Sequence, residues 1–199
     1  MKKSFLILCV LVSWNTARGQ QTLFNTEIRP GYFVKPSLQT GQIAGEQAGL
    51  LNLNAGLIIN KQFAFGAMYS FTFNEFTPST ETDPNIYHDM QLAGATIEYI
   101  WKSDQLIHFT IPVTFGGGEI QADWKDDFNY DDNADDNFGE DSFFFVEPGV
   151  MMEINLLPFM RLNAGVTYRY IPGDVDYRGL AANDISGLTL SGGLKFGLF

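Results

Sequence analysis

The sequence has only one cysteine, Cys9, and it lies in an apolar run near the N-terminus. If that run is removed on export, the remaining chain contains no thiol. Disulfides, thiolate metal sites and cysteine nucleophiles are then excluded. A lipid-modified cysteine usually follows a small residue, whereas Leu8 precedes Cys9. A lipoprotein is therefore disfavoured.

The sequence also lacks an apolar stretch long enough for a transmembrane helix, which needs roughly 20 residues. The run from Phe5 to Trp14 is too short, and it follows Lys2 and Lys3 and precedes the small residues around Gly19. This order is typical of a secretory signal peptide. We expect residues 1–19 to be the signal peptide, cleaved after Gly19, and residues 20–199 to form one domain.

Basic residues are scarce. The chain has 12 Lys and Arg against 23 Asp and Glu, and the predicted signal peptide holds three of the bases and none of the acids. Its removal leaves nine bases against 23 acids, a formal charge of -14. So acidic a domain has no electrostatic basis for binding nucleic acid, which is excluded as a partner.

No segment shows a sustained helical period, but apolar residues alternate with polar or small ones along most of the mature chain. Eight segments show this period of two: 27–37, 49–60, 63–74, 90–101, 106–116, 143–155, 159–171 and 185–199. The connections alternate between short (60–62, 102–105, 156–158) and long (38–48, 75–89, 117–142, 172–184). The pattern predicts an all-β fold, an eight-stranded antiparallel up-and-down transmembrane barrel with both termini on the short-turn rim.

A soluble barrel, the alternative, would turn the apolar face inward. Aromatic residues near the strand ends favour the membrane barrel, because they resemble two interfacial girdles. They are Phe63, Tyr99 and Trp101 towards the short-turn rim and Phe73, Phe144, Tyr168 and Tyr170 towards the other. The opposite face is rich in Gly, Ala, Ser, Thr and Asn, which suits a narrow lumen.

Charged residues on the inward face are nearly balanced. The expected lumen network comprises Glu27, Glu98, Glu147 and Glu153, the bases Arg29, Lys35, Arg161, Arg169 and Lys195, and His108. Charges enclosed by lipid persist when they are paired. We therefore predict a salt-bridged interior and not an ion path.

The layout resembles the small outer-membrane β-barrels of Gram-negative bacteria, the group that includes the OmpA barrel, OmpX and OmpW. The ending SGGLKFGLF is similar to the signal read by the barrel-assembly machinery, although Phe199 is out of phase with Leu194, Phe196 and Leu198. Either the strand bulges near Gly197 or Phe199 lies beyond it. The resemblance implies residence in the outer membrane, with its lipid and the assembly machinery as partners.

Fold alone does not choose a role within this group. The sequence favours a structural, surface-interaction or ligand-binding role through the long extracellular loops. A narrow channel for small or apolar solutes is the first alternative, and Pro30, Pro112 and Pro148 could kink the wall to open a lateral path, although simple strand distortion is favoured. A lipid-modifying enzyme is the second alternative. No serine is placed to act with His108, so an enzyme is not predicted.

The stretch from Glu119 to Ser142 is unusually acidic. Oxygen-bearing side chains stand there at every second position, Asp127, Asn129, Asp131, Asn133 and Asp135, and could supply some of the ligands of calcium, above all Asp127, Asp131 and Asp135. The EF-hand pattern fails, because the sixth position is not Gly and the twelfth is not Glu. A solvated surface loop is the favoured alternative, and no other cofactor is expected. His88 lies in the second predicted long loop, with no signal beyond weak metal contact.

Overall fold

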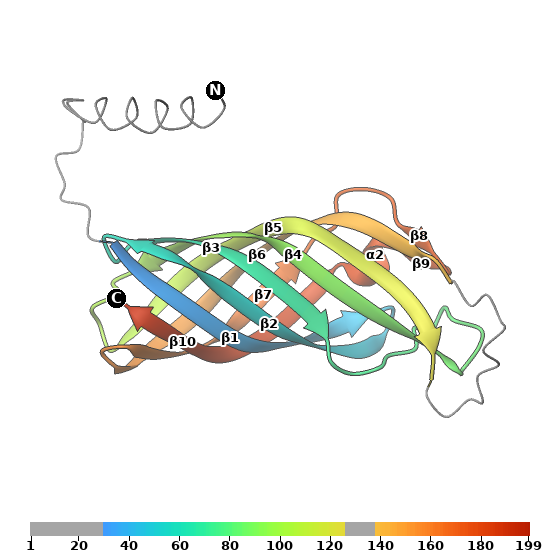
Figure 1. Ribbon diagram of the computed structural model, residues 1–199, viewed down its shortest axis with the longest axis horizontal. Coiled ribbons are helices and arrows are strands. Elements are labelled where there is room, and N and C mark those ends of the chain that lie inside the picture. Colours follow the sequence, from blue (N-terminus) through green and yellow to red (C-terminus); the bar gives the residue numbers. More distant parts are fainter. Residues whose placement is uncertain (1–29, 126–137) are drawn as a thin grey trace, which may run out of the picture.

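The computed structural model describes residues 30–125 and 138–199. Eight antiparallel strands close into a barrel in the order β1-β10-β7-β6-β5-β4-β3-β2 (Figure 1). The wall strands are β1 (Pro30–Ile43), β2 (Glu46–Ile59), β3 (Phe63–Thr72), β4 (Ile86–Trp101), β5 (Ile107–Trp124), β6 (Glu140–Leu157), β7 (Met160–Arg169) and β10 (Gly187–Leu198). The predicted all-β barrel and its strand number are confirmed.

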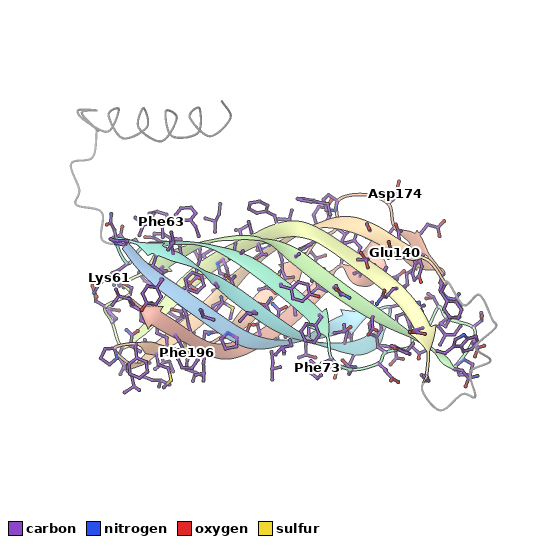
Figure 2. All side chains as sticks on the ribbon, viewed as in Figure 1. Lys61, Phe63, Phe73, Glu140, Asp174 and Phe196 are labelled. Carbon is purple, nitrogen blue, oxygen red and sulfur yellow. The ribbon has the colours of Figure 1, made fainter. Side chains whose placement is uncertain are left out.

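The barrel is apolar on the outside. Tyr32 and Leu57, paired on β1 and β2, are each 60% exposed, although they are large apolar side chains. Figure 2 shows Phe63, Phe73 and Phe196 projecting outward from the wall. A continuous apolar exterior of this size is incompatible with water and fits the hydrocarbon core of a bilayer. The alternating faces assigned from the sequence are confirmed.

The two rims differ as predicted, but the predicted bounds of the long connections need correction. Figure 2 shows Lys61 at the short-turn rim, where Figure 1 marks the C-terminus, and shows Glu140 and Asp174 towards the opposite rim. The expected long loop 38–48 is wrong, because β1 and β2 continue to a two-residue turn at Ala44 and Gly45. Both residues have positive φ, 48° and 87°, as a tight hairpin turn requires.

Three longer connections remain on the long-loop rim; the first two are shorter than predicted, and the last, 170–186, is longer than the predicted 172–184. β5 continues to Trp124, β6 begins at Glu140 and β4 begins at Ile86. The last of these connections is folded: it holds the two-stranded hairpin β8 (Asp176–Tyr177) and β9 (Leu180–Ala181) and the short helix α2 (Ala182–Ile185).

In the described parts of the chain, no helix is long and apolar enough to cross a membrane.

The prolines distort the wall locally. Pro30 is the first residue of β1, where no ladder donor is needed. The pairing of β5 with β6 is interrupted between Thr110↔Met151 and Val113↔Pro148, beside Pro112, and resumes in the same register. The pairing of β1 with β10 is interrupted at Lys35 and Pro36 but keeps one register to Tyr32↔Leu198, so Phe199 lies beyond the strand and Gly197 does not bulge.

Candidate functional site

The half of the lumen nearest the short turns is filled by a charge network centred on Lys195. Its ammonium donates hydrogen bonds to Glu98 Oε1 at 2.6 Å and to Glu153 Oε1 at 2.9 Å. Lys35 lies 3.8 Å from Glu98 Oε2. These residues come from β1, β4, β6 and β10, so the ion pairs join opposite sides of the wall. The alternation of the strands directs all four side chains inward.

His108 and Arg161 complete this network. His108 Nε2 lies 3.1 Å from Glu153 Oε2 and 3.4 Å from Arg161 Nη1, and Arg161 Nη1 donates to Glu153 Oε2 at 3.3 Å. The other ring nitrogen, Nδ1, lies 3.3 Å from the carbonyl oxygen of Gln105. The network therefore places His108 beside Glu153.

A second pair lies further along the lumen. Arg169 Nε donates to Glu147 Oε2 at 3.2 Å, and the same carboxylate accepts from Thr167 Oγ1 at 2.6 Å and Gln39 Nε2 at 3.3 Å. Both charged groups are nearly fully buried. With this pair, every described member of the predicted network is in the lumen. Glu27 and Arg29 lie outside the described residues.

The two ion-pair groups are separated by a polar cavity of about 30 Å³, bordered by Lys35, Asn54, Thr96 and Glu147. This volume admits a water molecule or two. Asn54 Nδ2 donates to Thr96 Oγ1 at 2.8 Å across it. The cavity is therefore too small to form a pore.

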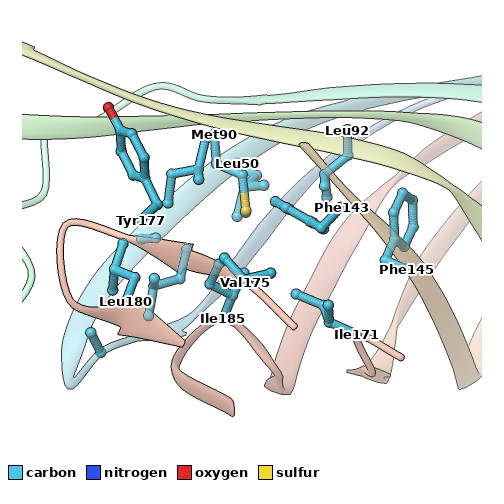
Figure 3. Packing of buried hydrophobic residues seen from close by; sticks show 14 of the residues in the cluster. Leu50, Met90, Leu92, Phe143, Phe145, Ile171, Val175, Tyr177, Leu180 and Ile185 are labelled. Atoms are coloured by element: carbon cyan, nitrogen blue, oxygen red, sulfur yellow. The ribbon is translucent and has the colours of Figure 1, made fainter. Parts of the chain in front are cut away.

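The other half of the lumen, nearest the long connections, is apolar, and the alternating pattern gave no prediction of this. We call this cluster the apolar plug (Figure 3). Its members are Ile43, Ala44, Ala48, Leu50, Met68, Phe76, Met90, Leu92, Ile120, Phe143, Phe145, Ile171, Val175, Tyr177, Leu180 and Ile185. Wall strands supply most of the plug, and Val175, Leu180 and Ile185 come from the folded connection between β7 and β10. One signal was present: in Phe143-Phe144-Phe145 both faces of the strand are aromatic.

The connections at this rim form a cap on the plug. The β1–β2 turn joins it, because Ala44 N donates to Asp184 O at 2.8 Å and Ser79 Oγ donates to Ala44 O at 2.6 Å. Arg178 in the β7–β10 connection donates hydrogen bonds of 2.7 and 3.0 Å to Glu81 in the β3–β4 connection. The Arg178 guanidinium lowers the pKa of Glu81 from 4.5 to about 2. Hydrogen bonds and an ion pair between these connections therefore hold the cap in place.

His88 is part of the plug region and not of a loop, which corrects its predicted position. It lies in β4 beyond the outward apolar stripe, since its outward-facing neighbours are Tyr87 and Asp89. Its ring is fully buried between Phe76 and Tyr177, with centroids 6.2 and 5.9 Å away. Burial lowers the pKa of His88 from 6.5 to about 4, although Glu81 opposes the shift.

The predicted calcium ligands Asp127, Asp131 and Asp135 lie outside the described residues, so this hypothesis stays a prediction. Within residues 30–125 and 138–199, no group of three or more His, Cys, Asp or Glu side chains is arranged to hold a metal ion. His108 has no serine among its hydrogen-bond partners in this part of the chain. The arrangement supplies paired charges and packing, without a nucleophile beside a base.

No protein-family model matches the sequence, and no curated protein matches it. Solved structures match its fold. Neisserial surface protein A superposes with a TM-score of 0.60 at 14% identity, covering 86% of this chain and 99% of that protein. OprG from Pseudomonas aeruginosa gives 0.53 at 8% identity, covering 86% and 97%. Ail of Yersinia pestis, solved with the heparin analogue sucrose octasulfate, gives 0.52 at 13% identity, covering 87% and 100%.

These structures are small outer-membrane β-barrels. Together with the closed ring of eight strands and the apolar exterior, they define the class: this chain is an eight-stranded β-barrel of the outer-membrane kind. In such barrels the short turns and termini face the periplasm and the long connections face outward. The outer membrane is accordingly the location of the protein.

Proposed function

We propose that this barrel does not conduct solutes and acts, without catalysis, as a surface protein whose capped extracellular end is the interaction site. One observation carries the proposal: the lumen is closed in both halves, by buried ion pairs near the periplasm and by the apolar plug near the outside. An eight-stranded barrel is narrow enough for side chains to fill it. What remains available for recognition is the extracellular surface.

Opening the lumen is costly on either side. A solute passing the periplasmic half has to separate Lys195 from two buried carboxylates, and breaking one buried pair costs about 3–5 kcal/mol. A solute passing the extracellular half has to displace the cap and the packed side chains behind it. These costs oppose the narrow-channel alternative.

The extracellular end carries a strong negative charge. Among the described residues beyond the outward apolar band, 12 are acidic and two are basic. The acids are Glu46, Glu75, Glu81, Asp83, Asp89, Glu119, Asp123, Glu140, Asp141, Asp174, Asp176 and Asp184, and the bases are Lys125 and Arg178. Complementary potentials steer association and exclude partners of like charge. The charge therefore favours a cationic partner.

This charge separates the chain from one of its structural neighbours. Ail was solved with sucrose octasulfate, a polyanion. The acidic extracellular end of the present barrel repels such a ligand, so the similarity in fold gives no reason to expect heparin-like binding here.

Planar-bilayer recording tests the closed lumen. The folded protein is expected to give no reproducible openings. A variant in which Phe143, Phe145 and Leu92 become Ala removes volume from the plug and serves as a comparison for leak currents. Stable single-channel steps from the unaltered protein would contradict the proposal.

Binding experiments test the extracellular surface. Barrels in nanodiscs are expected to retain polylysine and not heparin, with retention falling as salt rises. In the control variant, the exposed Glu140, Asp174 and Asp176 become the matching amides, which lowers the extracellular charge without touching the plug. Equal retention by both forms would exclude the acidic end as the binding surface.

A further inference from the structure

A hollow of about 390 Å³ opens at the periplasmic end of the barrel. Three short turns and the last residue of the sequence surround it: it is lined by Lys61, Ser103, Asp104, Asn155, Leu156, Leu157, Pro158, Arg161 and Phe199. The hollow lies on the opposite side of the charge network from the apolar plug, so its chemistry is independent of the extracellular end.

The floor of the hollow is cationic. Arg161 is 3% exposed, its Nη1 bonds Glu153, and its Nε has no hydrogen-bond partner. The Phe199 ring lies over this guanidinium at 3.8 Å. In the described chain, the periplasmic half of the lumen holds three bases, Lys35, Arg161 and Lys195, but two acids, Glu98 and Glu153. A buried excess of positive charge favours an anion close by.

A second cation stands at the mouth of the hollow. Lys61 bonds Asp104 at 2.8 Å, but the Asp104 side chain is 80% exposed. Exposed pairs of this kind contribute little, because water and salt screen them. The flexible Lys61 side chain can therefore leave Asp104 for a more highly charged anion.

The side of the hollow that faces the bilayer is apolar. Leu156 and Leu157, the last two residues of β6, are 46% and 45% exposed. An anion in the hollow would have cations beneath it and hydrocarbon beside it. That is the environment of a phospholipid headgroup in the periplasmic leaflet.

From this arrangement we propose that the periplasmic hollow binds a phosphate group through Lys61 and Arg161. Guanidinium and ammonium donors make charge-assisted hydrogen bonds to phosphate oxygens. The phosphate belongs either to a lipid whose acyl chains rest on Leu156 and Leu157 or to a small soluble phosphate. This site does not depend on the function proposed for the extracellular end.

Solution NMR of the whole folded barrel in a phosphate-free detergent tests the proposal. One titration adds inorganic phosphate at constant ionic strength, and the other adds a short-chain phosphatidylglycerol below its micelle concentration. Both are expected to shift the amide signals of Lys61, Ser103 and Asn155 in a saturable way. Binding of the lipid at least tenfold tighter, with added shifts at Leu156, identifies the lipid source, whereas equal or weaker lipid binding identifies the soluble one.

Three variants at exposed residues test the site without changing the buried Arg161. Their expected effects on phosphate binding differ: one weakens it, one tightens it and one leaves it nearly unchanged. Lys61→Met removes a charge-assisted bond and is expected to weaken binding about tenfold. Asp104→Asn removes a competing charge and is expected to tighten binding several-fold. Lys102→Met, a control, removes a charge from the same rim but outside the hollow, where Lys102 lies over Trp101, and is expected to change little.

The proposal is overturned if neither probe gives saturable shifts in the unaltered protein. It is also overturned if Lys61→Met and Lys102→Met weaken binding equally, because the effect would then be general electrostatics. Lack of tightening in Asp104→Asn would likewise place the phosphate elsewhere.

Discussion

The two halves of the lumen are equally buried but are stabilised in different ways. Near the periplasm, Lys195 is fully buried between Glu98 and Glu153, and each charge depends on a partner at a fixed position. Near the outside, Phe145 is fully buried among other apolar side chains, and the stability of this half depends on how completely they fill the space. The charged half should therefore be sensitive to the loss of one partner, and the apolar half to the loss of volume.

The largest expected effect follows from breaking the charged half. Lys195→Met leaves two buried carboxylates without their shared cation, and we expect it to lower the free energy of unfolding by about 3–5 kcal/mol. Urea unfolding in lipid vesicles, followed by the heat-dependent shift in gel mobility, measures this loss.

The double variant Lys195→Met with Glu98→Gln separates charge from size. It removes one orphaned carboxylate, while Glu153 keeps Arg161 and His108. We expect it to recover a substantial part of the lost stability. If the double variant is no more stable than the single one, packing and not pairing holds this half together.

The next effect probes the apolar half. Phe145→Ala leaves a cavity in the plug, and we expect a loss of about 3–4 kcal/mol, whereas Phe145→Leu should cost less than about 1.5 kcal/mol. The adjacent Phe144 faces outward and is the matched control, because Phe144→Ala opens no internal cavity. Equal losses from Phe144→Ala and Phe145→Ala would show that the plug is not a tightly packed core.

The charged half of the lumen was predictable from the sequence, whereas the apolar half was not. The period of two assigned Lys195, Glu98 and Glu153 to the lumen, because charged residues on a lipid-enclosed barrel must face inward. The same rule is silent on Phe145, since an apolar residue is acceptable on either face. Alternation therefore located the charged half and missed the apolar one.

The cap was missed for a related reason. Residues 172–184 have no hydrophobic period, because β8, β9 and α2 are too short to show one. The turn at Ala44 carries no Asn-Gly or Asp-Gly signal, and its positive φ is enforced by contacts with Asp184 and Ser79. Such contacts between distant segments are tertiary and leave no local pattern.

Acid should loosen the apolar half at its outer edge. His88 has a folded-state pKa of about 4 against an ordinary 6.5, so its contribution is complete above pH 6.5 and is lost as pH falls towards 4. We expect a loss on the order of 1–3 kcal/mol between pH 7 and 4.5. Glu81, Arg178 and Tyr177 surround the ring, and Glu81 adds a further loss between pH 4.5 and about 2.

His88→Leu removes the first titration and keeps an apolar side chain in the plug. Its stability is expected to stay level from pH 7 to 5 and to fall only below about 4.5, where Glu81 becomes protonated. Thermal unfolding followed by circular dichroism across this range measures both windows. An unchanged pH profile in His88→Leu would mean that other groups cause the acid sensitivity.

The smallest expected effect comes from an exposed ion pair whose length is similar to that of a buried one. Lys61 and Asp104 are 2.8 Å apart, almost as close as Lys195 and Glu98 at 2.6 Å, but they lie on the solvent-exposed rim. Lys61 lowers the pKa of Asp104, yet solvent screening limits what this adds to stability. We expect Asp104→Asn to change the free energy of unfolding by less than about 0.5 kcal/mol, and still less in high salt. Urea unfolding measures this change. If Asp104→Asn lost as much free energy of unfolding as Lys195→Met, two ion pairs of similar length would be equivalent on the rim and in the interior. Burial would then not be what makes the lumen pairs strong.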